Sequence, residues 1–171
     1  MLLSCPVASL RHGHSLVHRR CGFDEQLREL GAEAYASALA EHRSRIRQVC
    51  AAFGGVEVDT PGRRLLYGVR GRAVATHAQT FTEALAPGLI RVRVGLHSGT
   101  PVTTDEGYVG EDVHLAARIA AAAHGGQIVL SGATRTLLDD GWELVDLGEH
   151  RLKDFGAPIA IYRIGHGSFR R

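Results

Sequence analysis

The chain has 171 residues, a formal net charge of +2 at pH 7 and 44% hydrophobic residues. This length suits one domain with a core of its own, and the interspersed acids and bases argue against a nucleic-acid-binding or membrane-binding face. Without an apolar run of about 20 residues or a basic N-terminal region, the sequence predicts no membrane span and no signal peptide. Three irregularly spaced cysteines predict no disulfide framework and a cytoplasmic location.

The first 70 residues predict an irregular segment, a long helix and a hairpin. Residues 2–10 are compatible with a short strand interrupted at Pro6, whereas residues 11–22 have neither strand alternation nor a helical stripe and are predicted to be irregular. Apolar residues at helical intervals predict one helix from Asp24 to just before residues 54–55. Two short β-type runs within residues 56–69 predict a hairpin.

The rest of the chain alternates helices with strands. The predicted order is a helix within residues 71–88, a strand over 89–99, a helix over 111–124, a strand over 127–131, a short helix over 132–140, and strands near 144–147 and 159–164. This order predicts an α/β (α+β) fold, a ferredoxin-like sandwich with helices on one face of a mainly antiparallel sheet.

The most specific motifs lie between residues 91 and 134. GLHSG ends a strand, YVGEDVHLAAR begins a helix, and GGQIVLS follows it; GEHRLKDFGAPIAIYRI then ends the pattern. This ordered set resembles the class III nucleotidyl cyclase catalytic domain in its bacterial form, the adenylate and guanylate cyclase family. The resemblance covers roughly residues 27–165. It divides the chain into an irregular or degenerate N-terminal strand segment (1–23), a cyclase-homology domain (24–165) and a basic tail (166–171).

The resemblance implies a reaction that converts a nucleoside triphosphate into a 3′,5′-cyclic nucleotide and pyrophosphate, at sites shared across a head-to-tail homodimer. Two Mg²⁺ or Mn²⁺ ions would activate the 3′-hydroxyl and neutralise the phosphates, and such hard cations need carboxylate oxygens. The pattern therefore requires two metal aspartates on adjacent strands. It also requires a lysine and a second residue that read the base, and an asparagine and an arginine on one helix.

This chain departs from the pattern at most of these positions. No acidic residue precedes Asp24, so the first metal aspartate is absent. Arg63 stands in place of the second metal aspartate, and a guanidinium group does not ligate Mg²⁺. Asp59 stands in place of the base-reading lysine, and Gly107 leaves the second base-reading position without a side chain.

Two positions of the pattern remain. Arg118 matches the arginine that stabilises the transition state, and Lys153 matches the near-terminal lysine that contacts phosphate. His114 stands in place of the asparagine, four residues before Arg118, so both lie on one helix face. That face suits a joint ligand contact, or else both residues line a dimer groove or pair with carboxylates. Arg63 and Arg64 together with Arg118 would also suit a phosphate clamp, since guanidinium can replace metal charge beside phosphate.

These departures predict a degenerate cyclase-like domain in intracellular signalling that acts by dimerisation or by docking onto a signalling or transcriptional-regulator partner. No cofactor is then expected, and Mg or Mn only if the chain is active. One alternative is a weak or heterodimeric cyclase that makes cyclic AMP or cyclic GMP from ATP or GTP; another is a nucleotide-sensing module that binds a nucleoside triphosphate weakly. A homodimer is expected from the shared site and from the small helix face around Ala116, which needs a partner or a sheet to cover it.

Overall fold

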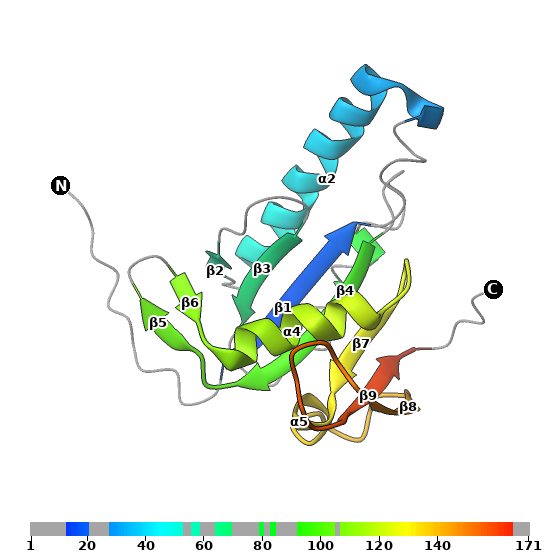
Figure 1. The fold of residues 1–171 in the computed structure, drawn as a ribbon. Helices are drawn as coiled ribbons and strands as arrows, with labels where there is room; N and C mark the ends of the chain where they lie inside the picture. The colour runs from blue at the N-terminus through cyan, green and yellow to red at the C-terminus, as the bar shows by residue number, and fades with distance from the viewer. Residues whose placement is uncertain are drawn as a thin grey trace.

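The computed structural model describes residues 13–20, 28–52, 56–58, 64–69, 79–80, 83–84, 92–104 and 107–165. A seven-stranded sheet forms the body, and a two-stranded sheet lies beside it (Figure 1). The strands are β1 (Gly13–Arg20), β2 (Val56–Val58), β3 (Arg64–Val69), β4 (Val92–Gly99), β5 (Val102–Thr104), β6 (Gly107–Val109), β7 (Ile128–Ser131), β8 (Leu144–His150) and β9 (Ile159–Ile164). The helices are α2 (Ala32–Ala52), α4 (Glu111–Ala122) and α5 (Gly132–Arg135). None of the helices in these ranges has the length and apolar character needed to cross a bilayer.

The main sheet has the order β2-β3-β1-β4-β7-β9-β8. Its neighbours pair antiparallel except for β4 and β7, which run parallel. The predicted mixed fold with a mainly antiparallel sheet is therefore confirmed. The hairpin of β2 and β3, the strand β4, the helix α4 and the strands β7, β8 and β9 also lie where the sequence predicted them.

The helices cover both faces of the sheet, which corrects the expectation that they would lie on one face. Val94 and Leu96 of β4 are fully buried in a cluster that contains Ile46 of α2. Gly95, between them, faces the backbone of Ala120 in α4. Because successive residues of a strand point to opposite faces, α2 and α4 lie on opposite sides, with α4 in front of the sheet in Figure 1.

The prediction that residues 11–22 are irregular is wrong, because β1 occupies residues 13–20 at the centre of the sheet. It pairs with β3 on one side and with β4 on the other. The mostly polar sequence GHSLVHRR lacks the alternation of apolar and polar residues by which a strand is recognised. Two flanking ladders supply main-chain hydrogen bonds along its length, and such tertiary context overrides a weak local pattern. The strand considered for residues 2–10 lies outside the described residues.

The long N-terminal helix is interrupted at Gly31, whose φ is +76°. Residues 28–30 are helical, and α2 then begins at Ala32 and ends at Ala52, close to the predicted end. This left-handed conformation is one that glycine adopts at little cost, so the break follows from Gly31. The residues that α2 buries most deeply are Tyr35, His42 and Ile46.

A small hairpin, β5–β6, was not predicted from the sequence. Its two strands have three residues each and pair with Val102 opposite Val109. Both valines are exposed, at 61% and 48%. Such short strands give too few residues for an alternation to be recognised. The helix expected within residues 71–88 is described only at residues 79–80 and 83–84, which are helical.

Candidate functional site

The helix α4 carries two residues of the expected site, the retained Arg118 and the substituted His114. Its backbone also lies very close to the sheet. A Cβ atom on Gly95 would lie 2.3 Å from the backbone nitrogen of Ala120. Ala116 and Ala120 are buried at this contact. Small residues on both elements therefore let the helix backbone approach the strand. The small face around Ala116 is covered by the chain's own sheet, so it gives no evidence for a second subunit.

A hydrogen-bond network fixes the first turn of α4 to β4. The carboxylate of Asp112 accepts from the backbone N–H of Thr100 at 2.7 Å, and its other oxygen lies 3.1 Å from His97 Nε2. Because a carboxylate only accepts, Nε2 carries the proton of this contact. His97 is 5% exposed, so the network anchors α4 through a buried side chain.

The same imidazole reaches the start of α5. His97 Nδ1 lies 2.8 Å from Ser131 Oγ, and Ser131 caps α5 by accepting from the N–H of Thr134 at 3.3 Å. This order of carboxylate, imidazole and hydroxyl resembles a nucleophilic triad. However, Ser131 is 2% exposed and its oxygen is already an N-cap, so no substrate carbonyl can reach it. Ser131 therefore has a structural role, as the N-cap of α5.

The far end of α4 is held by an arginine from β4. Arg93 NH1 donates to the carbonyl oxygens of Ala121 and Ala123, at 3.1 and 3.0 Å. Carbonyls at a helix C-terminus have no partner within the helix and carry partial negative charge, which a cation offsets. Both ends of α4 are thus tied to β4, and the residues between them have fixed positions.

His114 and Arg118 lie one turn apart on α4 and have different surroundings. His114 is exposed, whereas Arg118 is partly buried and pairs through NH2 with Asp154 Oδ2. The side chains in this pair are 32% and 56% exposed. Of the alternatives left open by the sequence, pairing with a carboxylate is therefore what Arg118 does in the structure.

The loop between β8 and β9 brings Asp154 to Arg118. Leu152 packs against the buried cluster that contains Ile119, the residue after Arg118. The N–H of Phe155 donates to the carbonyl of Leu152 at 3.1 Å, which closes a turn around Lys153 and Asp154. Lys153 is exposed in this turn. Two predicted site residues, Arg118 and Lys153, are thus brought into one region.

The other predicted site residues are dispersed or not described. Asp59 and Arg63 lie outside the described residues. Gly107 begins β6 and pairs with Thr104. Arg64, the residue after Arg63, begins β3 opposite Arg19 of β1, and Arg19 in turn lies opposite Arg93 of β4. This row of three arginines, which we call the arginine row, was not recognised from the sequence because β1 was not.

The described residues do not fit a divalent metal. They contain no group of three or more histidine, cysteine, aspartate or glutamate side chains that could hold one. Asp112, an acid on α4, is already bonded to Thr100 and His97. Arginines stand where β1 ends and β3 begins, and hard cations are not held by guanidinium groups.

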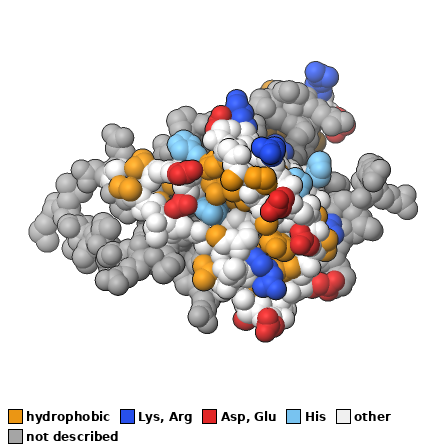
Figure 2. Space-filling view, turned by 60° about the horizontal axis from the view of Figure 1, so that its bottom comes forward, with side chains coloured by type: hydrophobic (Ala, Val, Ile, Leu, Met, Phe, Trp, Pro, Cys, Tyr) orange, Lys and Arg blue, Asp and Glu red, His pale blue; other side chains and the backbone are white. Residues whose placement is uncertain are grey.

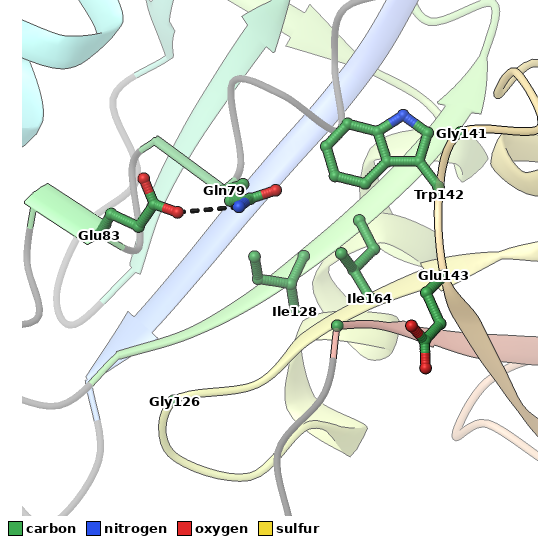
Figure 3. Close-up of a pocket in the computed structure, with 9 residues that line it drawn as sticks. Gln79, Glu83, Gly126, Ile128, Gly141, Trp142, Glu143 and Ile164 are labelled. Atoms are coloured by element: carbon green, nitrogen blue, oxygen red, sulfur yellow. Dashed lines mark hydrogen bonds between the residues drawn. The ribbon is translucent and has the colours of Figure 1, made fainter.

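A cavity of about 580 Å³ lies on the α2 face of the sheet, away from α4. Figure 3 shows the ring of Trp142 toward Ile128 and Ile164, with Gln79 donating to Glu83 at 2.8 Å on the opposite wall. The remaining lining residues are Gly126, Gly141, Glu143 and Gly165. Because its ionisable lining side chains are carboxylates, this cavity does not suit a triphosphate.

The surface in Figure 2 has acidic, basic and apolar side chains interspersed, without one large patch of either sign among the residues coloured there. Such a surface does not have the single-sign field that attracts a polyanion over long distance. Ligand recognition at this face would therefore depend on individual contacts.

Three site residues were missed by sequence reasoning: His97, Asp112 and Asp154. His97 and Asp112 could have been recognised from the sequence. His97 is a polar residue inside a predicted strand, and Asp112 is an acid in the first turn of the helix that follows, so a hydrogen bond between the two could have been expected. Asp154 could not have been recognised in this way, since its partner Arg118 is 36 residues away.

Comparison with known proteins gives both sequence relatives and solved structures. An uncharacterised Mycobacterium tuberculosis protein is 44% identical over 92 residues, which is 51% of this chain and 31% of that protein. A second uncharacterised protein of the same species is 32% identical over 136 residues, 72% of this chain and 54% of that protein. The chain thus spans about a third to a half of the length of these relatives.

The solved structures match over nearly the whole chain. An adenylate cyclase from Trypanosoma brucei in its monomeric state has a TM-score of 0.81 at 19% identity, over 95% of this chain and 93% of that one. The adenylyl cyclase CyaB from P. aeruginosa has a TM-score of 0.78 at 20% identity, over 92% and 95%. The family described as the adenylate and guanylate cyclase catalytic domain matches residues 21–165. Together with the α4 and β4 geometry, this match shows that the chain belongs to the adenylate and guanylate cyclase catalytic domain family.

Proposed function

We propose that this chain is a cyclase-family domain that has lost cyclase chemistry and acts in intracellular signalling through dimerisation or partner binding. The arginine row carries this proposal. Arg64, Arg19 and Arg93 are direct neighbours in register, at the end of the sheet where the family pattern requires metal aspartates. Cyclase-family domains typically use Mg²⁺ or Mn²⁺ when active, and positively charged residues at these strand positions oppose the binding of such cations.

The remaining features of the chain support the same conclusion. Asp59, Arg63, Gly107 and His114 depart from the family pattern, and we propose that base reading and ribose positioning are lost with the metals. We also propose a cytoplasmic location, which the three irregularly spaced cysteines support. A signalling or transcriptional-regulator protein is the partner class proposed, and the longer relatives are consistent with a domain that works beside others.

The test is a direct assay with purified protein. Incubation with ATP or GTP and Mn²⁺ should give no cyclic nucleotide above a no-enzyme control, because the two metal-aspartate positions of the family pattern carry no carboxylate in this sequence. Nucleotide affinity should be measured in parallel by calorimetry. Turnover that disappears in Arg118→Ala would overturn the proposal, since it would show a working site built from other ligands.

A second candidate is a heterodimeric cyclase, in which a partner supplies the metal aspartates and this chain supplies Arg118 and Lys153. The observation that favours it is that both residues lie in one region, where Lys153 is exposed and Arg118 is partly accessible to solvent. The same assay, repeated with a coexpressed cyclase-family partner that has intact aspartates, separates the two. Activity that needs both chains and Arg118 would establish the heterodimer.

We expect the isolated chain to form a homodimer through the β5–β6 hairpin. Val102 and Val109 are exposed and adjacent across this hairpin, and apolar pairs of this kind are stabilised when a second surface covers them. A related guanylyl cyclase domain, from Blastocladiella emersonii, is described as dimeric. Light scattering at micromolar concentration should give a dimer mass, and Val102→Asp should give a monomer.

The matched control for this dimer prediction is Leu147→Asp. Leu147 is 40% exposed on β8, away from the hairpin, so its substitution should leave the dimer intact. A monomer mass for the unmodified chain, or a dimer that Val102→Asp leaves unchanged, would contradict the assignment of the hairpin.

A further inference from the structure

We propose that Asp154 governs whether Arg118 binds an anion, because its carboxylate holds the place that the oxygen atoms of a ligand would take. The ligand class is a phosphate-containing anion such as pyrophosphate or the polyphosphate of a nucleotide. This inference rests on the second candidate function in one respect, the use of Arg118 at the site of a nucleotide.

The ion pair between Arg118 and Asp154 is open to solvent. Arg118 NH2 contacts Asp154 Oδ2, and the two side chains are 32% and 56% exposed. A pair of this exposure contributes little to folding. A phosphate group offers several oxygens to the planar guanidinium and makes stronger, forked contacts than the one oxygen of Asp154 used here. A polyphosphate can therefore compete with Asp154 without unfolding the site.

The backbone at Asp154 does not require a carboxylate. Its φ is +72°, a region in which glycine is preferred and asparagine is tolerated as well as aspartate. The turn itself is closed by the main chain, from Phe155 N–H to the carbonyl of Leu152. The turn is therefore closed without the side chain of Asp154. The hydrogen bond that this side chain makes among the described residues is the one to Arg118.

The groups beside the pair also favour an anion once Asp154 moves away. Lys153 precedes it in the exposed turn, and His114 lies exposed one helical turn from Arg118. Asp154 lowers the local positive charge and repels a phosphate, whereas Arg118 and Lys153 attract one. Removing this one negative charge should therefore raise affinity for pyrophosphate.

The experiment compares the full chain with Asp154→Asn by titration calorimetry, with pyrophosphate as the probe, at low ionic strength and in EDTA. Asparagine keeps the shape and the left-handed backbone but loses the charge. Affinity should rise about fivefold, the effect of losing an exposed ion pair. Asp140→Asn removes an equal charge from another exposed site and should leave affinity unchanged.

The double variant Arg118→Gln/Asp154→Asn should lose the gain entirely. The proposal is wrong if Asp154→Asn binds no more tightly than Asp140→Asn, if neither binds pyrophosphate, or if the gain persists without Arg118. Equal melting temperatures among the variants exclude a folding effect. Cyclic nucleotide formation by the unmodified chain would contradict the proposed loss of activity. It would not affect the comparison of pyrophosphate binding between Asp154→Asn and Asp140→Asn.

Discussion

Replacing Gly95 with alanine should lower the free energy of unfolding by about 3 kcal/mol, the upper range for inserting a methyl group into a packed core. The added Cβ would lie 2.3 Å from the backbone nitrogen of Ala120 and 2.6 Å from its Cα. Both atoms belong to the α4 backbone, so no side-chain rotation relieves the overlap and the helix has to move off the sheet. Urea denaturation followed by far-UV circular dichroism measures the change.

Gly132→Ala is the matched control for this substitution. A Cβ at Gly132 would lie 3.6 Å from the side chain of Ala160, an ordinary van der Waals distance. Alanine also favours the helical conformation of α5 over glycine. The control should therefore be neutral or slightly stabilising. Similar unfolding curves for Gly95→Ala and Gly132→Ala would show that α4 does not lie as close to β4 as described.

The second large effect is expected for Asp112→Ala, at about 2 kcal/mol of stability. This change removes the partner of His97 Nε2 inside the protein and the acceptor for the N–H of Thr100. The imidazole is nearly inaccessible in the folded chain, and a buried polar group that loses its partner is costly. Thermal and urea unfolding measure the loss.

Two variants separate this network from a general charge effect. Glu111→Ala removes the neighbouring acid in the first turn of α4, where its exposed charge interacts with the helix dipole, so it should cost less than about 1 kcal/mol. Asp112→Asn keeps an oxygen for Thr100 and should retain part of the stability. Equal losses for Glu111→Ala and Asp112→Ala would refute the role of His97.

The sequence predicts those helices and strands that are marked by their own apolar periodicity and by the turn residues beside them. The helix α4 begins after Gly110 and ends at Ala122, three residues before Gly125, and such turn residues together with the periodic apolar positions predict both limits. The buried strand β7 is likewise a short apolar run between polar residues. These elements needed no knowledge of their partners, and the family motifs lie on them.

Other parts depend on contacts between distant segments and could not be predicted in this way. β1 is a strand because β3 and β4 flank it, although most of its own residues are polar. The break at Gly31 depends on one backbone conformation that a helical pattern does not reveal. Arg118 was correctly selected, but its carboxylate partner follows from the packing of Leu152 beside Ile119.

The central position of β1 also has a consequence for how the chain is synthesised. β1 ends at Arg20, whereas its partners begin at Arg64 and Val92, so on the ribosome this strand emerges long before either ladder can form. An unpaired strand that waits in this way is open to pairing with other chains. Charged residues in such a segment act as gatekeepers against aggregation. The polar composition that concealed β1 in the sequence is thus suited to protecting the nascent chain until β4 has been made.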